Sequence, residues 1–86
     1  MGRVIRYSRL VRKEYSLYLQ VGDEVFHERY LRWGKGTVVE ERSSQIPGGF
    51  CYVRISFQDG SIRVFDNNFK SSSCCYYAGI RKLEER

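Results

Sequence analysis

The feature that most constrains the fold is an Asp-Gly pair between two β-type runs. Asp59 and Gly60 follow the run at residues 50–57, in which Tyr52, Arg54 and Ser56 alternate with the apolar residues at positions 51, 53, 55 and 57, and precede a second run at residues 61–66. Asp-Gly is the preferred chemistry of a tight hairpin turn, because both residues tolerate the backbone angles that such a turn requires. The sequence therefore predicts an antiparallel hairpin whose first strand is half-buried.

Three further segments have the composition of short strands: residues 24–27, 37–41 and 79–83. Gly22-Asp23 forms a turn before the first of them, and Gly34 and Gly36 bracket Lys35 in a bend before the second. Five short strands in about 65 residues cannot remain a flat sheet with one apolar face exposed. We expect a mainly all-β fold in which the sheet curls into a small barrel.

Basic residues are concentrated at the N-terminus of this 86-residue chain. Residues 1–20 contain one acid, Glu14, and five bases: Arg3, Arg6, Arg9, Arg12 and Lys13. We therefore divide the chain into a basic N-terminal extension, residues 1–20, and one barrel domain, residues 21–86. Such an arm is typical of proteins that contact a polyanion such as nucleic acid. The alternative is that the arginines only keep a small protein soluble.

The conformation of the extension has two interpretations. On a helix, one face would carry Val4, Tyr7, Val11, Tyr15 and Tyr18, and Ser8 would cap the first turn. On a strand, Ile5, Tyr7, Arg9 and Val11 would share a side instead. A helix or an irregular arm is the expectation that we carry forward.

Cysteine and histidine are too few for most reactive centres. Cys51, Cys74 and Cys75 are odd in number and two are adjacent, which argues against a disulfide framework. No C-x-x-C pair and no second histidine joins His27, so we expect no metal site and three small buried thiols. His27 is expected to be structural, and no nucleophile motif surrounds any serine or cysteine. We predict no enzymatic activity and no cofactor.

Aromatic rings beside cations mark the candidate binding residues. One group lies in the loop between the first two predicted strands: Tyr30, Arg32, Trp33 and Lys35. There the rings would stack on bases and the cations would meet phosphates, unless Trp33 packs into the barrel floor. A second surface would join Tyr52 and Arg54 to Arg63 and Phe65 on the partner strand. Tyr76 and Tyr77 would point to opposite sides if their segment is extended.

Four motifs occur in a recognisable order. They are V-G-D-E-V-F-H at residues 21–27, W-G-K-G-T-V-V at 33–39, V-R-I-S-F-Q-D-G at 53–60 and I-R-K-L at 80–83. Together they resemble the Tudor-like domain at the C-terminus of bacterial UvrD- and PcrA-type helicases, and the RNA-polymerase-interacting domain of the CarD type. The resemblance implies a five-stranded SH3-like or Tudor-like barrel that docks on RNA polymerase or nucleic acid and has no catalytic residues.

Two functions therefore remain open. The first is a non-catalytic module that binds DNA or RNA in a salt-sensitive, non-specific way, in association with transcription or repair. The second is a protein-interaction module that docks on RNA polymerase or another protein, or that forms a homodimer, without contacting nucleic acid. No apolar run approaches the roughly 18 residues of a membrane span and no secretory signal is evident, so a soluble cytoplasmic protein is expected.

Overall fold

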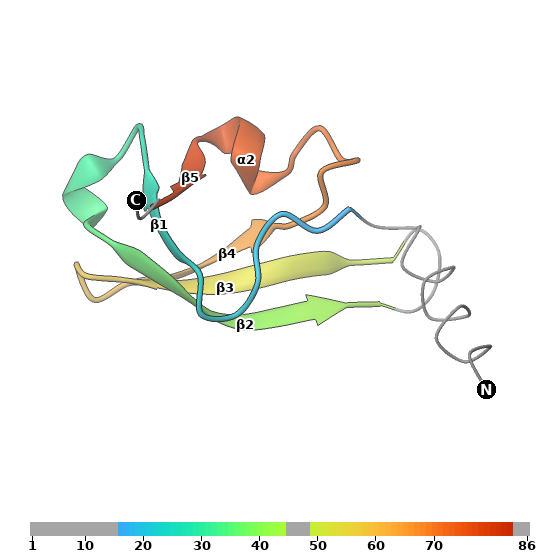
Figure 1. The fold of residues 1–86 in the computed structure, drawn as a ribbon, viewed down its shortest axis with the longest axis horizontal. Coiled ribbons are helices and arrows are strands. Elements are labelled where there is room, and N and C mark those ends of the chain that lie inside the picture. Colours follow the sequence, from blue (N-terminus) through green and yellow to red (C-terminus); the bar gives the residue numbers. More distant parts are fainter. Residues whose placement is uncertain (1–15, 45–48, 84–86) are drawn as a thin grey trace.

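The computed structural model describes residues 16–44 and 49–83 and confirms a mainly β fold (Figure 1). The elements in chain order are β1 (Glu24–His27), the short 3₁₀ helix η1 (Leu31–Trp33), β2 (Gly36–Ser43), β3 (Cys51–Phe57), β4 (Ile62–Asp66), α2 (Cys75–Ala78) and β5 (Ile80–Lys82). All strand pairings are antiparallel, and the order across the sheet is β4-β3-β2-β1-β5. The predicted strands are all present, in the predicted order.

The sheet bends over itself into a half-barrel that fits a small all-β barrel. Strands β2, β3 and β4 run side by side, whereas β1 and β5 turn away and lie with α2 on the opposite side of the core (Figure 1). An irregularity in the pairing of β2 with β3 falls between Val38 and Glu40. A β-bulge of this kind bends a strand and increases its twist, which helps the sheet to curl.

Alternation along β3 builds the centre of the core. Cys51, Val53, Ile55 and Phe57 are buried, and the residues between them are only half-buried. The core is completed from the other elements by Leu19, Val25, Val38, Cys74, Cys75 and Ile80, which are also buried. All three thiols are free and buried, as expected from their apolar surroundings.

A segment before the first strand closes the open side of the half-barrel. Leu17 forms an isolated antiparallel bridge with Asn68, and the backbone N–H of Tyr18 donates to the carbonyl of Asn67 at 3.1 Å. Leu19 is fully buried. Residues 16–20 therefore belong to the packed domain, which begins before the predicted boundary between residues 20 and 21. The basic residues Arg3, Arg6, Arg9, Arg12 and Lys13, and the predicted helix, lie outside the described residues.

The pairing of β3 with β4 differs from the predicted surface. Ile55 lies opposite Arg63, and Arg54 lies opposite Val64. Directly opposite residues share a face of an antiparallel sheet, so Arg63 and Phe65 point to the core side and away from Tyr52 and Arg54. The prediction of one surface joining Tyr52 and Arg54 to Arg63 is therefore wrong.

The segment that contains Tyr76 and Tyr77 is helical. Both residues belong to the four-residue helix α2, and both side chains are exposed at the surface. The prediction that the two side chains point to opposite sides required an extended backbone, which this segment does not have. Among the described residues, no helix has both the length and the apolar character needed to cross a membrane.

Candidate functional site

In the predicted aromatic loop, Trp33 packs against other side chains of the protein. The ring of Trp33 is stacked on Tyr30, with centroids 4.7 Å apart and planes 14° from parallel. The guanidinium carbon of Arg63 lies 3.7 Å from the Trp33 ring centroid, and the buried His27 meets the indole edge-on at 5.0 Å. Since neighbours from its own chain already cover Trp33, Tyr30 is the ring of this pair that remains exposed.

Backbone hydrogen bonds fix this loop against the β3–β4 hairpin. The N–H of Asp59 donates to the carbonyl of Trp33, and the N–H of Gln58 donates to the carbonyl of Lys35. In return the N–H of Lys35 donates to the side-chain Oε1 of Gln58. Arg32 is exposed, and the Lys35 amine lies 3.3 Å from a carboxylate oxygen of Glu24. The four predicted loop residues therefore lie close together, in a loop that hydrogen bonds hold against the hairpin.

The outer face of β3, which carries Tyr52 and Arg54, has little free positive charge. Arg54 Nε lies 2.7 Å from Glu40 Oε1, and Arg42 Nε lies 2.7 Å from the other oxygen of the same carboxylate. The hydrogen bonds from Arg54 and then from Arg42 hold the pKa of Glu40 below its ordinary value. A carboxylate placed between the two guanidinium groups makes this face a weak candidate for phosphate binding.

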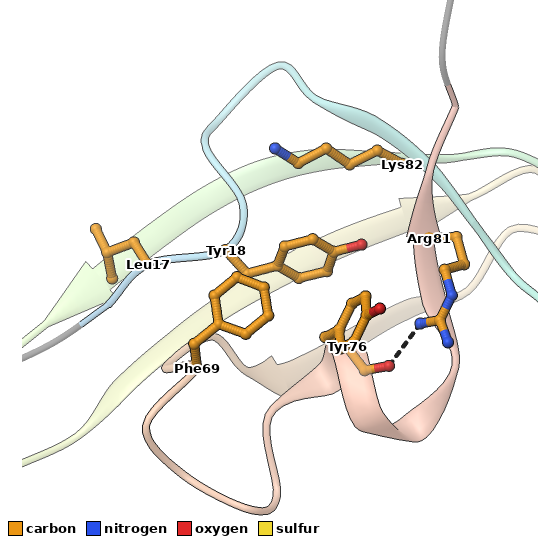
Figure 2. Close-up of a pocket in the computed structure, with 6 residues that line it drawn as sticks. All are labelled: Leu17, Tyr18, Phe69, Tyr76, Arg81 and Lys82. Atoms are coloured by element: carbon orange, nitrogen blue, oxygen red, sulfur yellow. Dashed lines mark hydrogen bonds between the residues drawn. The ribbon is translucent and has the colours of Figure 1, made fainter.

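A groove on the closed side of the half-barrel gathers aromatic rings from two distant parts of the chain, residues 17–18 and 69–76 (Figure 2). It has a volume of about 450 Å³ and is lined by Leu17, Tyr18, Phe69, Tyr76, Arg81 and Lys82. The ring centroids of Tyr18 and Phe69 are 4.9 Å apart, those of Tyr18 and Tyr76 5.3 Å, and those of Phe69 and Tyr76 5.4 Å. These separations are typical of packed aromatic pairs.

Two cations from β5 border these rings. The guanidinium carbon of Arg81 lies 4.3 Å from the Tyr76 ring centroid, and the amine of Lys82 lies 5.5 Å from that of Tyr18. Arg81 is held in place because Nη1 donates to the carbonyl of Tyr76 (Figure 2) and to that of Ile80, and because Nη2 lies 3.2 Å from Glu28 Oε2. Lys82 has a longer ion pair, 3.9 Å to Asp23.

The wall formed by Tyr18 is rigidly placed. Its hydroxyl donates to the carbonyl of Ile80 at 2.9 Å, which ties the N-terminal segment to β5. Burial raises the pKa of Tyr18, as does its proximity to Cys75, so the phenol remains a neutral donor at physiological pH. The groove thus combines fixed π surfaces with positive charge, an arrangement that can hold a planar, anionic ligand.

Sequence reasoning missed this groove because its residues are not neighbours in the chain. Tyr18 belongs to the predicted extension, whereas Phe69 and Tyr76 lie about 50 residues later in the chain. The available signal was the aromatic-rich stretch around Tyr76 and Tyr77 followed closely by Arg81 and Lys82. Only the folded chain places Tyr18 against both.

In the part of the chain that the structure describes, the remaining reactive side chains do not form a second site. His27 is buried, and its Nδ1 accepts a hydrogen bond from the backbone N–H of Arg29 at 3.2 Å. This contact fits the structural role predicted for His27. Within residues 16–44 and 49–83, no group of three or more histidine, cysteine, aspartate or glutamate residues could hold a metal ion.

Comparison with known proteins adds no relative. The chain matches no family model, and it gives no match among curated proteins or solved structures. The likeness to the helicase and CarD-type domains therefore stays a prediction from the sequence motifs.

Proposed function

We propose that this protein is a non-catalytic module that binds nucleic acid, with the groove lined by Tyr18, Phe69 and Tyr76 as its base-stacking site. The observation that carries the proposal is the position of Arg81 and Lys82 directly beside the clustered rings of the groove. Stacking on aromatic side chains is sequence-tolerant, and cations beside them attract the phosphate backbone. Binding is therefore expected to be non-specific and sensitive to salt.

The basic extension supports the same function. Lys13 precedes the groove residue Leu17 by only four positions, and Arg3, Arg6, Arg9 and Arg12 precede Lys13. Positive charge so close in the chain raises the local attraction for a polyanion near the groove. The extension would supply affinity without sequence preference, and the groove would supply the contact with bases.

Fluorescence anisotropy with labelled single-stranded DNA and RNA, recorded over a range of salt concentrations, tests the proposal. Lys82→Gln should weaken binding and reduce the salt slope by about one counterion, because one phosphate contact is lost. Lys35→Gln is the matched comparison, since both lysine side chains are 42% exposed and each has one carboxylate partner. If Lys35→Gln weakens binding and Lys82→Gln does not, the loop is the interface and the groove is not.

A second candidate function is protein interaction through β4, one of the two edge strands of the sheet. Ile62 and Val64 are 58% and 52% exposed on the outer face of this strand, where a partner strand or a second copy would cover them. Such a partner, whether RNA polymerase, another protein or a second copy, would stay bound after nuclease treatment. Affinity capture with and without nuclease, together with sedimentation of the purified chain, separates this function from nucleic-acid binding.

A further inference from the structure

A second hollow adjoins the groove and shares one of its walls. It has a volume of about 390 Å³ and is lined by Phe69, Lys70, Ser71, Ser72 and Tyr77. Phe69 lines both hollows, so this side chain separates them. The surface around Phe69 therefore offers two neighbouring depressions.

Aromatic contacts run continuously from one hollow to the other. The Phe69 ring lies 5.4 Å from Tyr76 in the first hollow and 6.4 Å from Tyr77 in the second, measured between ring centroids. Tyr76 and Tyr77 meet edge-on at 5.4 Å. Tyr77 is 54% exposed, so its ring is accessible to a ligand in the second hollow. Each depression thus has an aromatic surface of its own.

Positive charge accompanies both hollows. Arg81 and Lys82 line the first and Lys70 lines the second, whereas none of the described residues that line either hollow is acidic. Ser71 and Ser72 add hydroxyl groups to the second hollow. A ligand with two flat apolar groups joined by an anionic linkage matches this distribution of rings, hydroxyls and cations.

On the basis of the proposed function, we infer that the two hollows form one path for single-stranded nucleic acid, with consecutive bases on either side of Phe69. Bases of a duplex are stacked and paired, so they cannot enter separate aromatic hollows, whereas the unstacked bases of a single strand can. The smallest ligand that uses the whole path is a dinucleotide. The ligand class is therefore single-stranded DNA or RNA.

The test compares thymidine 5′-monophosphate with the dinucleotide pTpT by NMR titration of the full chain. Because one stacked base contributes about 1–3 kcal/mol, pTpT should bind roughly five- to 150-fold more tightly than the mononucleotide. Tyr77→Ser should reduce this ratio towards one by weakening pTpT and not the mononucleotide. Phe50→Ser is the matched control, since Phe50 is a similarly exposed aromatic residue that lines neither hollow.

Three results would overturn the inference. They are equal affinity for the two ligands, an equal loss of both in Tyr77→Ser, and binding of a hairpin duplex as tight as that of a single strand of the same length. In each of these cases nucleic-acid binding itself still stands. Absence of binding to any oligonucleotide at low salt would instead remove the proposed function, and the inference with it.

Discussion

The side-chain amide of Asn67 forms a two-way clamp on the backbone of Leu19. Its Oδ1 accepts from the Leu19 N–H at 2.8 Å, and its Nδ2 donates to the Leu19 carbonyl at 3.0 Å. Asn67 is fully buried, so each bond satisfies a polar group that water cannot reach. The clamp attaches the N-terminal segment to the connector after β4 and thereby closes the open side of the half-barrel.

Asn67→Asp should destabilise the fold, because it replaces the donor with a buried carboxylate oxygen that faces a carbonyl. We expect a loss of about 3 kcal/mol in the free energy of unfolding, measured by urea denaturation. Asn68→Asp is the matched control, since among the described residues the Asn68 side chain is engaged through Oδ1, which accepts from the N–H groups of Ser16 and Lys70. Equal losses in the two variants would contradict the clamp.

Gly34→Ala and Gly60→Ala should differ although both glycines have positive φ. Gly34 has φ +78° and Gly60 has φ +92°, so alanine is strained at either position by about 1–2 kcal/mol. A Cβ at Gly34 would also lie 2.8 Å from Cβ of Gln58, whereas a Cβ at Gly60 meets nothing within 4 Å. Thermal unfolding should therefore show the larger decrease in Tm for Gly34→Ala, and the reverse order would contradict the packing of this loop.

His27 should titrate below its ordinary pKa of about 6.5. Burial is the main cause of the lowered pKa, and the nearby charge of Arg29 adds to it. The neutral imidazole is favoured in the folded state, so this contribution to stability is present above pH 6.5 and is lost as the pH falls through the folded pKa. His27 is the only histidine, so its imidazole resonances are assigned without ambiguity in an NMR titration. A midpoint above 6.5 would be inconsistent with the burial of this ring.

The three thiols should resist alkylation until the protein unfolds. Burial raises the pKa of Cys51 and Cys74, and raises the pKa of Cys75 to about 12. At pH 8 roughly one Cys75 side chain in 10⁴ would be the reactive thiolate. Mass spectrometry after iodoacetamide treatment should find no addition to the native protein and three additions in denaturant. Rapid native labelling of Cys75 would contradict its burial.

The strands were predictable because their signals are local. Alternation from Cys51 to Phe57 and the turn at Gly60 identify two strands without reference to distant residues. The register was not predictable, because a two-residue Asp-Gly turn would place Arg63 opposite Ser56. The observed loop is one residue longer: Ser56 lies opposite Ile62, and the Phe57 N–H donates to the Ser61 carbonyl. A one-residue shift moves every side chain of the strand to the other face, so Arg63 lies over Trp33.

The groove was beyond sequence reasoning for a different physical reason. Tyr18 meets Phe69 and Tyr76 only because Asn67 and Asn68 pair with residues 16–19, a contact between segments far apart in the chain. No periodicity marks such a pairing. Tyr30 and Trp33, in contrast, were found as a local cluster, yet their stacking on each other depends on the hairpin that supports the loop.

The pairing of residues 16–19 with the connector also determines how the basic extension is to be studied. A deletion of residues 1–20, the natural choice from the sequence, would remove Leu19 from the core and Leu17 and Tyr18 from the groove. Loss of binding in that deletion would report a damaged fold as readily as a missing charge. Replacing Arg3, Arg6, Arg9, Arg12 and Lys13 with glutamine in the full chain removes their charge and leaves Leu17, Tyr18 and Leu19 in place. The contribution of the charge to binding can then be measured separately from that of the fold.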